Sequence, residues 1–172
     1  MKNDYEIRGD ETVIFLRRRD GTIVETIIDT VDFPKVDAFS GRWYASPNNG
    51  RRKPYVTIEC HRVRYHLSRI ILDTPNGLVA DHINQNTLDN RRSNLRIATI
   101  AQNAQNQMLQ RRSSSGVRGV YYQTDRKKWH ATIKLNGKKK FLGLYDTLEE
   151  AEKVTKNARK EYMPFSQEAM GM

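Results

Sequence analysis

Cysteine is nearly absent from this chain of 172 residues, in which Cys60 stands alone. A single cysteine excludes a disulfide within the chain and a structural zinc site built on cysteine pairs. It also favours a reducing, intracellular setting, because small secreted proteins commonly depend on disulfides. Long apolar runs are missing as well. No stretch approaches the roughly 20 residues that a membrane-spanning helix needs, so we expect no association with a membrane.

Acidic residues are scarce relative to basic ones. The chain has 20 Asp and Glu against 30 Lys and Arg, which gives a net charge of +10. A basic protein of this size commonly binds a polyanion. The excess is concentrated in residues 111–140, which hold ten Lys or Arg and one Asp. A solvated basic tail would show such a run too, but the aromatic residues and strand patterns between these charges favour a folded module.

The hydrophobic pattern predicts an α+β protein that begins with a β-rich N-terminal region, residues 1–75. The sequence Arg19-Asp20-Gly21 predicts a hairpin turn, because Asp-Gly tolerates positive φ. A second hairpin candidate has its turn at 47–52, PNNGRR. Residues 76–110 then predict two short strands, a long polar loop between them and a polar helix, which together make a compact ββα unit.

The C-terminal third is separated from this unit by residues 111–115, whose sequence RRSSS is typical of a linker. Residues 116–172 predict a three-stranded antiparallel sheet packed on one helix. The last two strands are joined at Asn136-Gly137. The helix begins after Asp146 or Thr147, either of which is a good N-cap. Alternation along the third strand predicts that Leu142 and Leu144 both point toward the helix.

Asparagine is unusually frequent between Ala80 and Gln107, in the segment ADHINQNTLDNRRSNLRIATIAQNAQNQ. Because Asn is unfavourable in helix interiors and strands, this segment is either a loop or a built site. The ββα unit can bring the Asp81 carboxylate and the Asn103 amide oxygen to one hard cation, with His82 facing a substrate. Oxygen ligands suit Mg²⁺, and histidine can take a proton from water near neutral pH. These are the parts of metal-assisted phosphodiester hydrolysis.

The spacing of Asp81-His82, Asn94 and Asn103, together with the sequence NLR, resembles the His-Asn-His (HNH) nucleases. It looks like the version found in phage and intron-encoded homing endonucleases. The resemblance implies that His82 is the general base and that Asn94 braces the loop and positions it. It implies that Asp81 and Asn103 bind Mg²⁺ or another divalent cation such as Mn²⁺. It further implies a phage-encoded protein that acts in the cytoplasm of a bacterial host.

The C-terminal module resembles the Apetala-type domain of plant ethylene-response factors, which is also found attached to phage HNH nucleases. Its marks here are RGV, KW, LG and TLEEA. The resemblance implies that the outer face of the sheet lies in the DNA major groove. Arg118 is the best candidate for a base contact. Tyr121 and Phe141 replace a usual Arg and a usual Trp, so the plant target site is not carried over. The other candidate contacts on this face are Thr132, Lys134, Lys139 and Phe141.

Taken together, the sequence predicts a Mg²⁺-dependent endonuclease that acts on double-stranded DNA. Arg91, Arg92 and Arg96 are candidates for phosphate contacts, and a solvated surface role is equally compatible with them. A monomer should nick and a homodimer could cut both strands, and the sequence leaves this open. The alternative is a DNA-binding regulator whose nuclease unit is inactive. An RNA-binding protein fits less well, because the major groove of A-form RNA is too narrow for a sheet.

Overall fold

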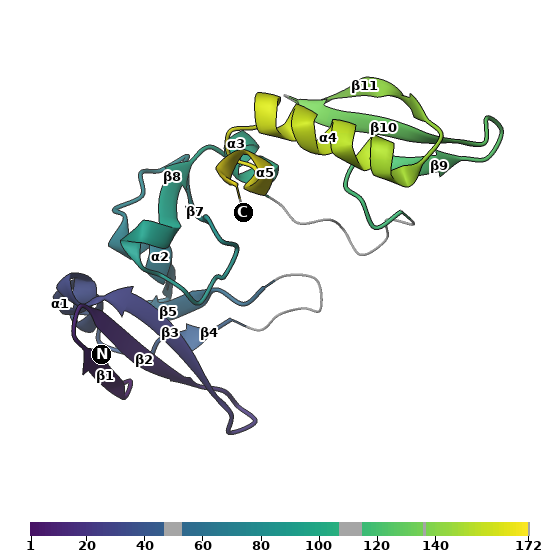
Figure 1. The fold of residues 1–172 in the computed structure, drawn as a ribbon. Coiled ribbons are helices and arrows are strands. Elements are labelled where there is room, and N and C mark those ends of the chain that lie inside the picture. The colour runs from purple at the N-terminus through teal and green to yellow at the C-terminus, as the bar shows by residue number, and fades with distance from the viewer. Residues whose placement is uncertain (47–52, 107–114, 136, 172) are drawn as a thin grey trace. The chain divides into compact units, whose positions relative to one another are not determined.

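The computed structural model describes residues 1–46, 53–106, 115–135 and 137–171 (Figure 1). Its contacts divide the chain into two compact units, Met1–Thr99 and Ile100–Met172. Helices and strands are mixed in the chain, which confirms the predicted α+β class. In the described part, no helix has both the length and the apolar character needed to cross a membrane.

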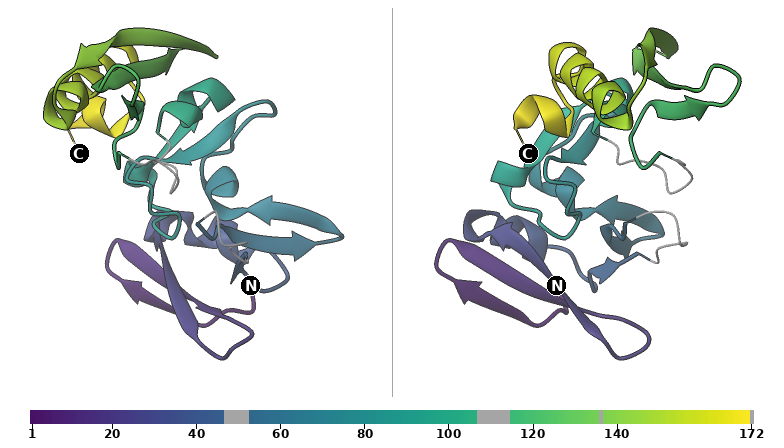
Figure 2. Two further views of the ribbon diagram at one scale, coloured as in Figure 1. Left: turned by 90° about the vertical axis from the view of Figure 1, so that its right-hand side faces the viewer. Right: turned by 45° about the vertical axis from the view of Figure 1, so that its right-hand side comes forward.

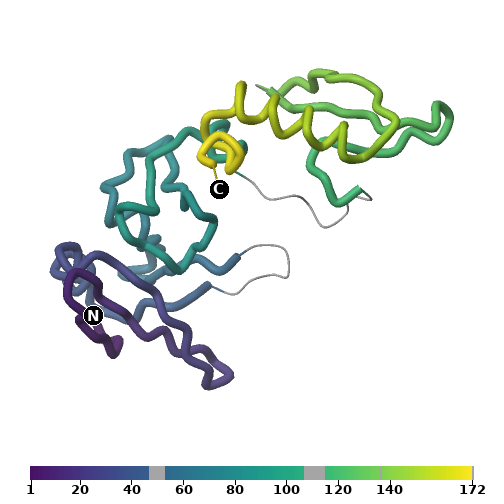
Figure 3. Tube along the Cα trace, viewed as in Figure 1, coloured from purple at the N-terminus to yellow at the C-terminus, as the bar shows by residue number. Residues whose placement is uncertain are grey.

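Two antiparallel sheets form most of the N-terminal unit. The first contains β1 (Tyr5–Arg8), β2 (Glu11–Arg17) and β3 (Ile23–Asp29) in that order. The predicted turn at Asp20-Gly21 joins β2 to β3, and this hairpin can be followed in the tube of Figure 3. The second sheet contains β4 (Tyr44–Ala45), β5 (Val56–Cys60) and β6 (Val63–His66). The predicted turn at 47–52 lies outside the described residues.

A pair of short strands completes this unit, namely β7 (Val79–His82) and β8 (Leu95–Ala98). The long loop between them ends in the 3-10 turn η2 (Arg92–Asn94). The remaining helical segments are η1 (Thr30–Asp32), α1 (Phe33–Asp37) and α2 (Leu67–Ile71). The strands and the polar loop therefore occur where the alternation and the Asn-rich composition predict them.

One hydrophobic core joins these pieces. Ile14 and Ile28 from the first sheet pack with Trp43, Leu67 of α2 and Leu95 of β8, and each is almost fully buried. Full burial of such a side chain contributes roughly 1.5–3 kcal/mol. Since Leu95 belongs to this core, the β7–β8 pair is built on the same apolar interior as the N-terminal sheets. This core contains residues from both sides of residue 75, and the predicted domain boundaries stay predictions.

The C-terminal unit begins with α3 (Ile100–Gln105) and continues into a sheet and two helices. The sheet consists of β9 (Val120–Gln123), β10 (Lys128–Leu135) and β11 (Lys138–Tyr145), with β10 in the middle. It is followed by α4 (Leu148–Tyr162), which lies along one face of the sheet (Figure 2), and by α5 (Gln167–Met170). Of the predicted linker, residues 111–114 lie outside the described part.

The buried face of the C-terminal sheet packs on α4. Val120 and Ala131 contact Ala151, and Ile133 contacts Ala158 and Met163. The helix begins as predicted at Thr147, whose side chain accepts from the Glu150 amide at 3.2 Å. The Glu150 carboxylate accepts from the Thr147 amide in return, which completes a capping box.

A β-bulge changes which residues of β11 face α4. Ala131 pairs with Gly143 and Thr132 pairs with Phe141, so Leu142 is the extra residue on β11. Leu142 packs in the core, whereas Leu144 stands opposite His130 and belongs to the outer face. The prediction that Leu144 points inward was wrong, because one inserted residue reverses the alternation beyond it.

Candidate active site

His82 ends β7 and is almost fully buried, with 4% of its surface exposed. Its Nε2 lies 3.1 Å from Oδ1 of Asn90. The Asn90 amide nitrogen faces the carbonyl oxygen of Thr87, so its oxygen faces the imidazole. Nε2 therefore carries the proton and donates it to Asn90, and Nδ1 is the basic nitrogen of the ring.

The protonation of His82 is controlled mainly by its burial. Burial lowers its pKa below the usual value, and this outweighs the Asn90 hydrogen bond and the nearby Asp81 and Asp89 carboxylates, which raise it. The ring of Tyr55 packs on the imidazole with centroids 6.0 Å apart. A histidine of this kind stays neutral near pH 7 and can accept a proton.

Asn90 is a functional candidate that the sequence alone did not single out. Its side chain is 1% exposed. Besides contacting His82, it donates from Nδ2 to the Thr26 hydroxyl at 3.0 Å. It thereby ties the imidazole to β3, which lies far away in sequence. Nothing in the local sequence distinguishes Asn90 from its neighbours, since its partners are brought together only by the fold.

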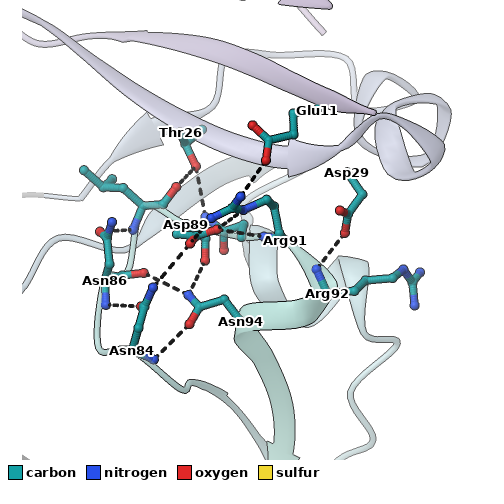
Figure 4. Close-up of polar contacts among 11 residues, drawn as sticks. Glu11, Thr26, Asp29, Asn84, Asn86, Asp89, Arg91, Arg92 and Asn94 are labelled. Carbon is teal, nitrogen blue, oxygen red and sulfur yellow. Dashed lines mark hydrogen bonds and ion pairs between the residues drawn. The ribbon is translucent and has the colours of Figure 1, made fainter. Parts of the chain in front are cut away.

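Asn94 closes the loop that separates the two strands. Its Oδ1 accepts from the Asn84 amide at 2.9 Å, and its Nδ2 donates to the Asp89 carbonyl at 2.7 Å. Figure 4 shows these contacts crossing the loop. Asn84 and Asn86 form Asx turns, with side-chain oxygens that accept from the amides of Asn86 and Leu88 respectively. Amide side chains thus hold the loop, while Leu88 also packs against the hydrophobic core.

Carboxylates of the same unit hold the three candidate phosphate-binding arginines. Figure 4 shows Arg91 between Asp89 and Glu11, with bonds of 2.7 and 2.5 Å. The hydrogen bonds from Arg91 to Asp89 keep the pKa of the Asp89 carboxyl below its usual range. Arg92 makes a two-pronged contact with the buried Asp32 at 2.8 and 2.7 Å.

Arg96 donates from two nitrogens to Oδ2 of Asp81, each at 2.8 Å. Asp81 is the predicted metal ligand, and it is 6% exposed. Its side chain and that of His82 are both fixed within the N-terminal unit. The other predicted ligand, Asn103, lies on α3 and belongs to the C-terminal unit. The roles predicted for these residues remain predictions.

The two predicted ligands, Asp81 and Asn103, are chemically suited to a hard cation. One carboxylate and one amide oxygen match Mg²⁺, which binds few protein ligands and keeps water and phosphate oxygens in its other positions. Such a site contains fewer than three ionisable ligands. The part of the chain that is described has no group of three or more His, Cys, Asp or Glu able to hold a metal. A cation bound at Asp81 would share its carboxylate with Arg96.

The outer face of the C-terminal sheet carries four of the eight predicted DNA contacts. Thr132 lies opposite Phe141, and Lys134 lies opposite Lys139, so all four share one face. His130 stacks on Tyr121, with centroids 4.5 Å apart, and lies 4.7 Å from Phe141. The result is a row of three rings across three strands.

Arg118 has a different environment from these residues. It precedes β9, and its guanidinium donates to the carbonyl oxygens of Gln105 at 2.7 Å and Ala104 at 3.1 Å. Burial lowers its pKa, and so does the nearby Arg159. Arg118 therefore holds the end of α3 within its own unit, and its predicted base contact stays a prediction that this geometry does not favour.

Comparison with known proteins relates the region around Asp81 and His82 to a family. Residues 73–105 match the family model described as HNH endonuclease, a segment that contains Asp81, His82, Asn94 and Asn103. The chain is also similar to "Protein 3.8" of Escherichia phage T7, with 32% identity over 75 residues. That match covers 44% of this chain and 62% of the phage protein, which is less than two thirds of its length. No solved structure matches the chain.

Proposed function

We propose that this protein is a DNA endonuclease that hydrolyses phosphodiester bonds with His82 as general base. The observation that carries the proposal is the buried His82, held by Asn90 within a segment that matches the HNH endonuclease model. With its proton on Nε2, the imidazole has a basic Nδ1 for the attacking water. Its lowered pKa keeps it neutral, and a neutral imidazole is the form that can take a proton.

The proposed metal ligands are Asp81 and Asn103, and the proposed cation is Mg²⁺ or Mn²⁺. A bound cation would stabilise the charge that develops on the scissile phosphate. Asn94 acts as a positioning residue, since its bonds to Asn84 and Asp89 fix the loop that follows His82. Arg96 orients Asp81 through its two contacts with Oδ2.

The proposed substrate is double-stranded DNA, and the outer face of the C-terminal sheet is the proposed recognition surface. This rests on the likeness to the Apetala-type domain and on the charge of the face. A two-stranded β-ribbon fits the major groove, and β10 and β11 are such a pair. The residues proposed to contact DNA there are Thr132, Lys134, Lys139 and Phe141.

The proposal is tested with supercoiled plasmid, because one nick relaxes it and two opposed cuts make it linear. We expect nicked circles with Mg²⁺ or Mn²⁺ and none with EDTA. A persistent absence of product with either cation would favour the second candidate, a DNA-binding regulator. The observation that favours a regulator is the Asp81–Arg96 ion pair, which already occupies one oxygen of the proposed metal ligand.

A further inference from the structure

An open pocket of about 430 Å³ lies in the N-terminal unit, where β6 meets α2. Its polar lining consists of Arg64, His66, Arg69, Asp73 and Thr74. None of these residues belongs to the spacing that resembles the HNH nucleases, and the function proposed above gives them no role.

The charges in this pocket are predominantly positive. Asp73 is its one acidic residue, and the Asp73 carboxylate is already paired with Lys35 at 2.5 Å. Arg69 is held by backbone carbonyls instead of a carboxylate, those of Leu78, Thr74 and Pro75. Its position is therefore fixed, and no described residue forms an ion pair with it. Arg64 is exposed and has no ion pair or hydrogen bond to any residue that the structure describes.

His66 forms part of the pocket wall, and the described residues do not meet all of its hydrogen-bonding capacity. Its Nδ1 is buried and lacks a hydrogen-bond partner among the described residues. Burial lowers the pKa of His66, and the charges of Arg64 and Arg69 lower it further. A buried polar atom without a partner is costly, and it commonly marks a place where water or an ion binds.

The pocket is connected to the candidate active site through Tyr55. The Tyr55 ring lies 6.0 Å from the His66 ring and 6.0 Å from the His82 ring. The two imidazoles can therefore be no further apart than twice that distance. Arg69 adds a second connection, because the Leu78 carbonyl that it binds immediately precedes β7, the strand that carries His82.

We propose that this pocket binds a backbone phosphate of the DNA strand that is cut, close along the strand to the phosphate attacked near His82. The inference rests on the proposed endonuclease function and adds a binding site to it. A DNA strand carries one phosphate about every 3.4 Å of helix axis, so the separation of the two imidazoles suits phosphates a few nucleotides apart. Guanidinium groups bind phosphate oxygens well, since their donors match the anion in geometry.

The first test observes His66 directly by NMR, using the intact chain in EDTA so that no DNA is cut. The chain has only four histidines, which keeps the imidazole spectrum simple. We expect the His66 signals to shift saturably with inorganic phosphate, and in the same direction with a short DNA duplex. Chloride at equal ionic strength should not shift them, and the exposed His61 should respond to neither anion. Equal responses at both histidines, or a response to phosphate but not to the duplex, would overturn the proposal.

The second test uses two variants with the same loss of charge. Arg64→Gln removes a guanidinium from the pocket, whereas Arg17→Gln removes one from the exposed end of β2. We expect Arg64→Gln to abolish the phosphate-induced shift of His66 and to raise KM for plasmid nicking about tenfold at low salt with kcat little changed. Arg17→Gln should leave both unchanged, and equal effects of the two variants would refute the pocket. If the protein nicks no plasmid at all, the endonuclease proposal fails, while the NMR arm still decides whether phosphate binds here.

Discussion

The arginines of the β7–β8 region and the lysines of the C-terminal sheet carry the same charge, but they differ in whether that charge is paired. Arg91, Arg92 and Arg96 are each bonded to carboxylates of their own unit. Lys134 and Lys139 form no ion pair or hydrogen bond with any described residue, and they flank an exposed row of rings. The difference teaches that the position of a positive charge in the sequence says little about its availability to a phosphate.

This contrast suggests a division of labour. Charges paired inside a unit organise a loop, and they hold Asp81 and His82 in place for chemistry. Charges left unpaired on an open sheet are available for counterion release, which supplies much of the affinity for DNA. Apart from the phosphate proposed to bind in the pocket of Arg64 and Arg69, the N-terminal unit should then govern the rate of cleavage, and the C-terminal sheet should supply most of the binding. Five experiments test this division, from the largest expected effect to the smallest.

The largest effect is expected for His82→Ala. Loss of a general base should reduce the nicking rate by roughly 10²–10⁴, while the affinity for DNA stays within about twofold because the unpaired lysines remain. Rates come from plasmid nicking and affinities from fluorescence anisotropy. His61→Asn is the matched control, since His61 is exposed in a turn with positive φ, which Asn tolerates. If His82→Ala weakened binding as much as cleavage, the two functions would not be separable in this way.

Much of the fold could be predicted because local signals determined it. Asp20-Gly21 predicted the β2–β3 hairpin, and the N-cap candidates Asp146 and Thr147 predicted the start of α4, where Thr147 is the cap. The orientation of Leu144 could not be predicted, because a β-bulge has no reliable signal in a single sequence. The sharing of one core by Ile28 and Leu95 depends on tertiary packing, which sequence patterns do not report.

For the candidate site, the sequence indicated the residue types but not their partners. The Asp81-His82 and Asn94 spacing is local and was recognisable. The bonds of Asn90 to Thr26 and of Arg92 to Asp32 join residues that lie far apart in sequence. A count of positive charges therefore could not reveal that Arg91, Arg92 and Arg96 are bonded to carboxylates of their own unit. Arg118 illustrates the same limit, since its carbonyl partners on α3 are not visible in the sequence.

The next effect concerns the stability of the N-terminal unit. Arg92→Gln would leave the carboxylate of Asp32, which is 4% exposed, without its ion pair. We expect a loss of about 1–2 kcal/mol in the free energy of unfolding, allowing for the half-exposed guanidinium, and no change in the salt dependence of DNA binding. Arg8→Gln is the control, because its pair with Glu6 is exposed on both sides. Urea titration measures the first quantity. A flatter salt dependence would show that Arg92 contacts a phosphate after all.

In the C-terminal sheet, the corresponding change is the double variant Lys134→Gln and Lys139→Gln. Each lysine that contacts a phosphate contributes about one unit to the slope of log affinity against log salt. The slope should therefore become less steep by up to about two units, while stability stays unchanged because neither side chain is bonded to a described residue. Lys35→Gln would be a poor control, since Lys35 pairs with Asp73. Lys2→Gln is suitable, because it removes an exposed charge outside the sheet.

A smaller effect is expected from the row of rings formed by Tyr121, His130 and Phe141. Apolar side chains in the major groove contact the methyl group of thymine. Binding should weaken about threefold to fivefold when a poly(dA-dT) duplex is replaced by its deoxyuracil counterpart, which lacks only that methyl group. In Phe141→Ala the two duplexes should bind alike. Equal binding of both duplexes by the unaltered protein would show that the rings do not read thymine.

The smallest effect is the pH dependence of cleavage, and its sign follows from the burial of His82. A lowered pKa means that the neutral base persists to lower pH than in an exposed histidine, whose pKa is about 6.5. At pH 6.5 an unperturbed base would be half protonated, so the nicking rate should be higher than that base would allow, by at most about twofold. The same shift makes the folded state bind fewer protons than the unfolded state. Stability from this group is therefore complete above the unfolded pKa and declines as pH falls through it toward the folded value. NMR titration of His82 beside a pH–rate profile measures both effects, and a common midpoint at or above 6.5 would mean that the imidazole is not buried when the protein acts.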